Sequence, residues 1–205
     1  ADLIVLVAKT DPQAKAKGIS IFLVDAALDG VKKGRSLQKI GLHAQDTAEL
    51  FFDDVCVPVT QRLGEEGQGF AYLMQELPRE RLSISMMALG AILGAIELTK
   101  DYVLERKAFG QPLSQMQNTR FVLANAQIKA KAAQAFVDQC AALYQQHQLS
   151  VTQVAALKCF ITDVQCEVID QLLQLFGGYG YMQEYPISRF FVDARVQKIY
   201  GGTNE

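Results

Sequence analysis

Four charged side chains stand directly before an uncharged stretch that runs from Leu82 to Ile96: Glu76, Arg79, Glu80 and Arg81. If the uncharged stretch is a buried helix, Glu80 brings a carboxylate to the edge of that helix. Burial raises the pKa of a carboxylate because the ionised form loses water, and such a group suits general-base removal of a proton from a weakly acidic carbon. Glu80 is therefore the first candidate for chemistry.

Two local features bear on this candidate. Pro78 removes a backbone hydrogen bond inside a helix and kinks the axis, so Glu80 would follow a bend that can aim its side chain away from the regular face. The plain alternative is a solvated first turn, because acidic residues are favoured near helix N-termini. Spacing alone leaves both interpretations open.

Composition excludes several other classes of function. The 205 residues carry a formal charge of −2 and no basic cluster, so we expect no binding to nucleic acid. The uncharged stretch is shorter than the roughly 20 residues of a membrane-spanning helix, and we expect no membrane span. The four cysteines form no C-x-x-C pair and have no neighbouring histidine, so no metal site is expected and the thiols should be reduced. Two histidines leave little for Ser/His/Asp or Cys/His chemistry.

Short apolar runs over residues 3–8 and 19–24 are separated by turn residues, and alternation resumes over 31–40 and 48–57. Residues 1–63 should therefore form a β-rich piece with too few strands to close a barrel. Since the first residues already resemble a buried strand, we expect the chain to be a fragment that lacks upstream strands.

A period of three to four residues predicts helices from residue 68 onwards. The first helix should cover 68–107. Ser114 and Gln117 form a possible capping box for a second helix to residue 146, and Ser150 and Gln153 form another for a third helix that ends at Gly177. A shorter helix is expected over 187–196. The predicted fold class is α+β, with part of a β-rich middle domain (1–63) before a C-terminal up-and-down helical bundle (64–205).

Three motifs carry a resemblance to the acyl-CoA dehydrogenase family. They are Leu-Pro-Arg-Glu80-Arg-Leu, Glu105-Arg-Lys-Ala-Phe-Gly110, and Gln174-Leu-Phe-Gly-Gly-Tyr-Gly-Tyr181 continued by Ile199-Tyr-Gly-Gly-Thr-Asn-Glu205. The β-rich start also resembles the second half of the middle domain of that family. The resemblance therefore covers essentially the whole chain.

The resemblance implies an FAD enzyme that oxidises acyl-CoA thioesters to trans-2-enoyl-CoA in fatty-acid β-oxidation and passes electrons to electron-transferring flavoprotein. In many members the base is a glutamate in a late Tyr-Glu-Gly-Thr run, where this chain has Gly201. In the long-chain and isovaleryl-type subgroups the base lies on the long helix, at the position of Glu80. The resemblance then gives Glu80 as base, the Gly201 N–H and a flavin ribityl hydroxyl as donors to the enolate oxygen, and Arg81 and Gly202 as neighbours of the acyl-CoA.

The resemblance also assigns eight positions to FAD: Arg106, Phe109, Gln117, Gln174, Gly177, Gly178, Thr203 and Glu205. One subunit would lend Arg106 and Phe109 to the FAD of its neighbour, which implies a homo-oligomer, a tetramer in the intact enzyme. At Glu205 many relatives carry glutamine. Plain structural alternatives are a helix C-cap for the glycine pair and a helix-end cation for Arg106.

Two rival functions remain open: a flavin oxidase or monooxygenase on the same scaffold, and a non-catalytic oligomerisation module. The resemblance implies a bacterial cytoplasmic or mitochondrial matrix location. We expect the fragment alone to bind FAD poorly and to have no turnover. The small residues Ala88, Gly90, Ala91 and Gly94 suit either a long acyl tail or close helix packing.

Overall fold

The computed structural model describes residues 1–205 and divides into two compact units. A strand-rich unit comprises residues 1–39 and 43–77, and a helical unit comprises residues 40–42 and 78–205. The predicted α+β class is confirmed.

The strand-rich unit contains two small antiparallel sheets. β1 (Leu3–Lys9) pairs with β2 (Ile19–Asp25) along its full length, and β2 pairs with the short β5 (Arg62–Leu63). β3 (Val31–Ser36) pairs with β4 (Ala48–Phe52) in the second sheet. The runs predicted at 3–8 and 19–24 are confirmed.

The other two predicted runs are shorter than expected. β3 ends at Ser36 after a register shift that begins at Lys33, and β4 ends at Phe52. Asp54 adopts φ +50°, a left-handed conformation that a strand cannot continue through. The predicted strand-like runs over 31–40 and 48–57 were therefore wrong at their C-terminal ends.

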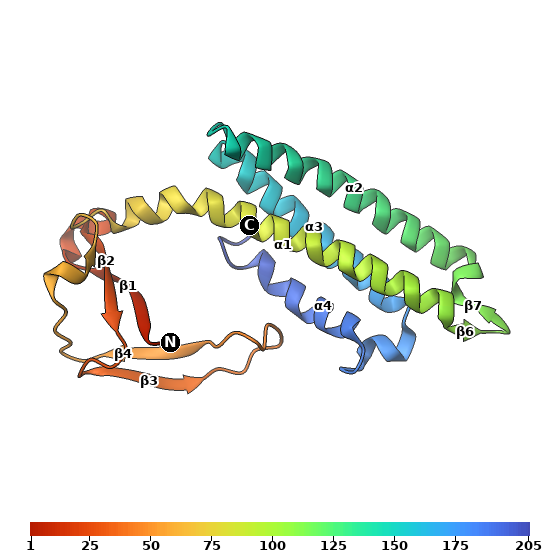
Figure 1. The fold of residues 1–205 in the computed structure, drawn as a ribbon, viewed down its shortest axis with the longest axis horizontal. Helices are drawn as coiled ribbons and strands as arrows, with labels where there is room; N and C mark the ends of the chain where they lie inside the picture. Colours follow the sequence, from red (N-terminus) through yellow and green to blue (C-terminus); the bar gives the residue numbers. More distant parts are fainter. The chain divides into compact units, whose positions relative to one another are not determined.

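Four helices build the helical unit (Figure 1). They are α1 (Gly69–Glu105), α2 (Gln117–Gln145), α3 (Val151–Gln174) and α4 (Pro186–Arg195). Between α1 and α2 the chain forms a hairpin of β6 (Lys107–Ala108) and β7 (Gln111–Pro112), and α2 runs back along the direction of α1 (Figure 1). The up-and-down order expected from the sequence is present.

The core of this unit is made by all four helices. α2 contributes mainly small residues, Ala126, Ala130 and Ala133, so α3 can approach it closely with the larger Leu157 and Ile161. Fully burying one such Leu or Ile side chain contributes about 1.5–3 kcal/mol. On α1, a Cβ at Gly94 would lie 3.3 Å from the Phe190 ring of α4, so that glycine serves close packing, whereas Gly90 faces open space.

One predicted helix start is correct and one is wrong. At α3, Ser150 and Gln153 form the expected capping box, with Gln153 N donating to Ser150 Oγ at 3.1 Å. At α2 the N-cap is Met116 and no side chain caps it. Ser114 instead lies in a 3₁₀ turn, Leu113–Gln115, where Met116 N donates to Leu113 O, so the chain satisfies its amides through the backbone and the helix begins later.

Along the chain, the boundary between the two compact units falls inside α1, between Leu77 and Pro78. The predicted domain boundary lies between residues 63 and 64. The first turns of α1 belong to the strand-rich unit because they contact it. A Cβ on Gly69 would lie 2.9 Å from Ile19 O, and the Tyr72 hydroxyl accepts from Glu65 N at 3.1 Å.

By length and hydropathy alone, α1 meets the criterion for a membrane-crossing helix, and half of its most apolar stretch is buried in the protein. Core helices of water-soluble proteins meet the same criterion. Ile92 and Ala95 of α1 are fully buried among the other helices, so the bundle core accounts for its apolar character.

Candidate functional site

Residues 200–203, here called the glycine turn, pack against the N-terminal half of α1. Gly201 and Gly202 have φ +64° and +94°, values that favour glycine. Arg81 Nε donates to Gly201 O at 2.9 Å, and a Cβ on Gly201 would lie 2.6 Å from Ile84 Cδ1. Backbone conformation and the nearby Ile84 side chain therefore both disfavour a larger side chain at position 201.

A buried lysine holds the other side of the glycine turn. Lys158 of α3, only 3% exposed, donates from Nζ to Gly202 O at 2.7 Å and to Asn204 Oδ1 at 2.9 Å. Asn204 Nδ2 in turn donates to Thr162 Oγ1 at 2.9 Å. Burial, with the nearby Arg81 charge second, lowers the pKa of Lys158. Two cations thus fix the carbonyls of the two glycines.

The backbone N–H groups of Gly201, Gly202 and Thr203 donate no hydrogen bond within the chain. Because a trans peptide places N–H opposite C=O, the cations that fix the carbonyls also fix the directions of the amides at residues 202 and 203. Successive free amides in such a turn favour an anion or a developing oxyanion.

Glu80 lies beside this turn but is not buried. It shares a face of α1 with Ile84 and Ala88, one and two turns later, and these two are buried whereas Glu80 is exposed. The expectation that Glu80 is buried was wrong for this chain, because the buried core of α1 begins only at Leu82. Its position next to Arg81 nevertheless places it at the glycine turn.

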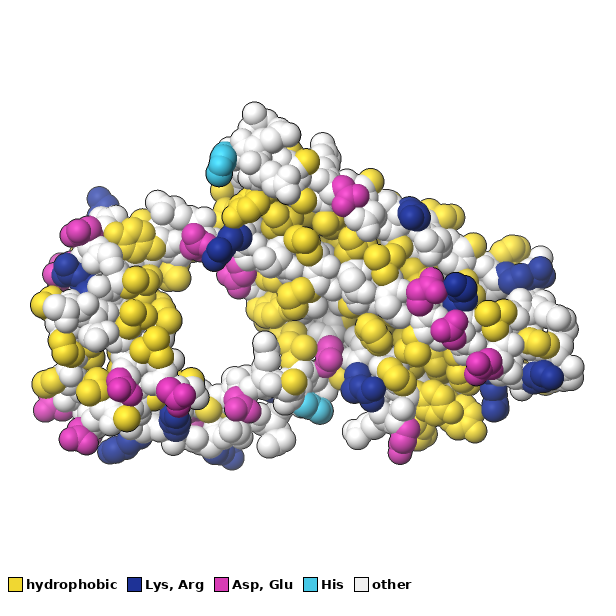
Figure 2. Space-filling view, in the orientation of Figure 1, with side chains coloured by type: hydrophobic (Ala, Val, Ile, Leu, Met, Phe, Trp, Pro, Cys, Tyr) yellow, Lys and Arg dark blue, Asp and Glu magenta, His cyan; other side chains and the backbone are white.

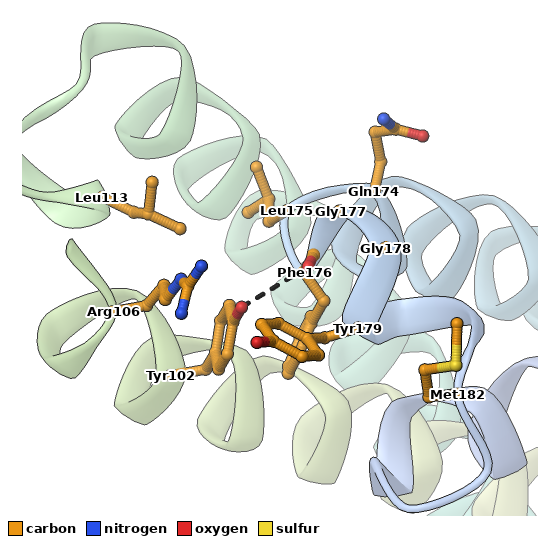
Figure 3. A pocket seen from close by; sticks show the side chains of 10 residues that line it. All are labelled: Tyr102, Arg106, Leu113, Gln174, Leu175, Phe176, Gly177, Gly178, Tyr179 and Met182. Atoms are coloured by element: carbon orange, nitrogen blue, oxygen red, sulfur yellow. Dashed lines mark hydrogen bonds between the residues drawn. The ribbon is translucent and has the colours of Figure 1, made fainter. Parts of the chain in front are cut away.

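A second group of the predicted residues lines a pocket of about 650 Å³ at the other end of α1 (Figure 3). Arg106, Gln174, Gly177 and Gly178 are among its lining residues. The guanidinium carbon of Arg106 lies 5.0 Å from the centre of the Tyr179 ring, and Arg106 forms no salt bridge. In Figure 3, the Gln174 side chain points away from this aromatic cluster.

Aromatic rings make the floor of the pocket. Tyr102 stacks on Phe176 with ring centres 4.1 Å apart, and its hydroxyl donates to Phe176 O (Figure 3). Burial raises the pKa of Tyr102, and the Arg106 charge opposes that rise. Gly177 and Gly178 have no atom within 4 Å of a built Cβ, so a ligand can approach their backbone directly. Flat rings, an unpaired guanidinium and bare backbone suit a ligand with an aromatic ring and a phosphate group.

The other residues that the sequence assigned to a cofactor stand apart from this pocket lining. Phe109 is 95% exposed at the tip of the β6–β7 hairpin, with φ +53°. Gln117, the first residue of α2, is exposed, as are Thr203 of the glycine turn and Glu205 two residues later. The structure therefore separates the predicted residues into a group at the glycine turn and a group at the pocket, with Phe109 and Gln117 in neither.

The two groups are far apart within one chain. Glu80 and Arg106 differ by 26 positions along α1 and its direct continuation, and at about 1.5 Å per residue they are roughly 39 Å apart. An extended dinucleotide is shorter than that. No single cofactor of this size contacts both groups of one chain.

Comparison with known proteins gives the family. The C-terminal domain of acyl-CoA dehydrogenases matches residues 67–205. The chain belongs to the acyl-CoA dehydrogenase family. The mitochondrial long-chain specific acyl-CoA dehydrogenase of Sus scrofa is 48% identical over 207 residues, which cover 100% of this chain and 48% of that protein.

Two solved structures of the acyl-CoA dehydrogenase family agree with this fold. An acyl-CoA dehydrogenase from Geobacillus kaustophilus is 46% identical with a TM-score of 0.95, and covers 100% of this chain and 54% of its own. The butyryl-CoA dehydrogenase from Megasphaera elsdenii is 36% identical with a TM-score of 0.92, and the match spans 100% of this chain and 53% of that one. The chain spans about half the length of the relatives it matches.

Sequence reasoning missed three residues that this acyl-CoA dehydrogenase family member places in its site. Lys158 had a usable signal, because it lies four residues after Val154 and three before Ile161, on the face predicted to be buried. Tyr179 lies inside the recognised glycine motif but had no assigned role. Tyr200, beside Gly201, had no distinguishing spacing.

Proposed function

We propose that the intact protein carries out FAD-dependent α,β-dehydrogenation of acyl-CoA thioesters to trans-2-enoyl-CoA, with Glu80 as the base. The observation that carries this proposal is the glycine at position 201, which supplies no carboxylate where many members of the family have their base. Its φ of +64° and the 2.6 Å approach of Ile84 Cδ1 to a built Cβ also disfavour a side chain there. Of the carboxylates near the glycine turn, Glu80 lies on α1 beside Arg81, whereas Glu205 is assigned to FAD.

The chain supplies three parts of the reaction. Glu80 takes the α proton of the thioester on its carboxylate. The free amide of Gly201 donates to the thioester oxygen as negative charge develops on it, and this lowers the barrier to removal of a weakly acidic proton. Arg81 orients the turn through Gly201 O and lies, with Gly202, beside the acyl-CoA.

FAD, when bound, accepts the hydride that leaves the β carbon. The pocket fits the adenosine diphosphate part of such a cofactor. Arg106 has no carboxylate partner and can donate two hydrogen bonds to a pyrophosphate. The backbone at Gly177 and Gly178 is accessible to a ligand, because no atom lies within 4 Å of a built Cβ. Gln174 lines this pocket, and Phe109 and Gln117 follow the lining residues Arg106 and Leu113 by three and four positions. Thr203 and Glu205 are assigned to the flavin end, near the glycine turn.

The separation of roughly 39 Å between the two groups supports a homo-oligomer in which each FAD uses the glycine turn of one copy and the pocket residues of another. Phe109 supports this arrangement, because an aromatic side chain that is 95% exposed contacts little in its own chain. Hydrophobic side chains spread over much of the visible surface of the helical unit (Figure 2). Phe121 and Ile128 of α2 are 64% and 68% exposed, as expected for a face that meets another copy. A homotetramer is the proposed state.

The partner that removes electrons is proposed to be electron-transferring flavoprotein. The proposed location is the mitochondrial matrix or the bacterial cytoplasm, since relatives of both origins match the chain. We further expect that the 205-residue chain alone binds FAD poorly and has no turnover. Its acyl chain-length preference is testable with a panel of acyl-CoA lengths.

The test of the proposed function is Glu80→Gln in the FAD-loaded intact protein. We expect acyl-CoA to stop bleaching the flavin while FAD stays bound. Glu97→Gln is the matched control, because Glu97 is an exposed carboxylate on the same helix that pairs only with Lys100. Normal bleaching in Glu80→Gln would disprove the role of Glu80. Rapid reoxidation of the reduced flavin by oxygen would instead favour an oxidase or monooxygenase.

A further inference from the structure

The hydroxyl of Tyr200 is buried and forms no hydrogen bond in the chain. Buried polar groups nearly always have a partner, and a buried hydroxyl without one destabilises the fold. Phenylalanine would fill the same space without this cost. The hydroxyl therefore needs an explanation other than packing.

Tyr200 directly precedes Gly201, which is hydrogen-bonded to Arg81, the residue after Glu80. Its neighbour Gly201 accepts a hydrogen bond from Arg81 and lies in contact range of Ile84. Glu80 precedes Arg81 in sequence and shares the face of Ile84, one turn earlier. The segment that carries the phenol and the turn that carries the carboxylate are thus neighbours.

Glu80 is the carboxylate whose charge acts on the Tyr200 phenol. Burial raises the pKa of Tyr200, and the negative charge of Glu80 adds to that rise. The other carboxylates near the turn have partners of their own: Asp163 pairs with Lys198 and accepts from Asn204 Nδ2, and Glu205 accepts from the Thr203 side chain. The cations Arg81 and Lys158 donate to Gly201 O and Gly202 O and cannot accept from a phenol.

We propose that Tyr200 is a positioning residue for the base, and that its hydroxyl donates a hydrogen bond to the Glu80 carboxylate when the exposed side chain turns toward the glycine turn. This inference rests on the proposed function of Glu80. A donor to the ionised carboxylate stabilises that form and selects one among its several rotamers. The base would thereby stay ionised and aimed at the α carbon beside the Gly201 amide.

The first test is Tyr200→Phe in the FAD-loaded intact protein, with Tyr144→Phe, an exposed tyrosine of α2, as the matched control. Loss of a donor makes the ionised form of a carboxylate less favourable, so the acidic limb of the pH profile of kcat/KM should move upward. kcat should fall more than KM rises, and FAD content should not change. The Tyr144→Phe profile should match the parent.

The second test does not depend on turnover. NMR titration of the labelled Tyr200 phenol should show a lower pKa in Glu80→Gln than in the parent, because the added rise due to the carboxylate charge is removed. An unchanged phenol titration overturns the proposal, and so does a Tyr200→Phe profile that keeps its acidic limb or shows only a higher KM. If Glu80→Gln still bleaches the flavin, the proposed function fails, whereas the phenol titration still decides whether Tyr200 and Glu80 interact.

Discussion

Replacing Gly201 with alanine tests how strongly the backbone and the Ile84 side chain disfavour a side chain at position 201, which supports the proposed function. The added methyl group must be accommodated at φ +64°, which costs about 1–2 kcal/mol for a residue with a Cβ. It would also lie 2.6 Å from Ile84 Cδ1, and overpacking of this kind costs about 1–3 kcal/mol. We therefore expect Gly201→Ala to lower the free energy of unfolding by about 2–5 kcal/mol.

The two contributions can be separated with a matched glycine and a second substitution. Gly110 has φ +82° but nothing within 4 Å of a built Cβ, so Gly110→Ala should show the backbone cost alone. Ile84→Val removes the Cδ1 atom and by itself costs about 0.5–1.5 kcal/mol. In the Gly201→Ala background it should relieve the collision, so that the double variant is about 1–2 kcal/mol more stable than the sum of the single effects predicts.

Urea denaturation of the intact protein, followed by circular dichroism, measures these differences. Equal losses in Gly201→Ala and Gly110→Ala, together with additive effects of Gly201→Ala and Ile84→Val, would refute the collision. In that case the lack of space at position 201 would no longer support the assignment of the base to Glu80.

Three further predictions concern charged residues. Lys158→Met should lower the free energy of unfolding by about 2–4 kcal/mol in urea denaturation, because it takes the donor from two part-buried acceptors, Gly202 O and Asn204 Oδ1. Lys131→Met, at an exposed lysine of α2, should change the free energy of unfolding by less than about 0.5 kcal/mol, and equal losses in the two variants would contradict the network. Arg106→Lys should weaken FAD binding about tenfold or more in fluorescence titrations of the intact protein, because lysine cannot form a two-point contact with pyrophosphate; unchanged affinity would remove Arg106 from the cofactor site. The hydrogen bond from Lys198 lowers the pKa of Asp163, so the pair stabilises the fold above the ordinary pKa of aspartate, and this contribution is lost as the pH falls through the lowered pKa. Since the pair is half exposed, the parent should be more stable than Asp163→Asn by less than about 1 kcal/mol, measured from the difference in Tm. The difference should vanish in acid, and a difference that persists there would refute the assignment.

The helices were predictable because their signals are local. Apolar spacing of three to four residues gave α1, α3 and α4 to within a few residues, and the Ser150 capping box lies within a single turn. Ser114 has the same local signal, but there the hairpin before α2 leads into a 3₁₀ turn that satisfies the backbone first. Sequence spacing cannot distinguish these two cases, because the competing 3₁₀ turn depends on the backbone conformation in which the hairpin ends.

The site was only partly predictable for a different reason. The motifs identified the correct segments, but the contacts that join them link residues far apart in sequence, such as Arg81 with Gly201 and Lys158 with Gly202. The burial of Lys158 follows from helical spacing, whereas its carbonyl acceptors do not. The exposure of Glu80 could not be predicted either, since it depends on where the bundle core ends along α1 rather than on the residues around it.

If Glu80 is the base, as proposed, its exposure in this chain predicts an order of events in the reaction. Water that solvates the carboxylate opposes proton transfer from carbon, so part of the barrier depends on removing that water. No side chain of the helical unit covers Glu80, and a thioester seated against the free amides of the glycine turn would lie over it and displace the water. Binding of the acyl group would then precede activation of the base, and a donor such as the Tyr200 hydroxyl would keep the desolvated carboxylate ionised until the proton is transferred.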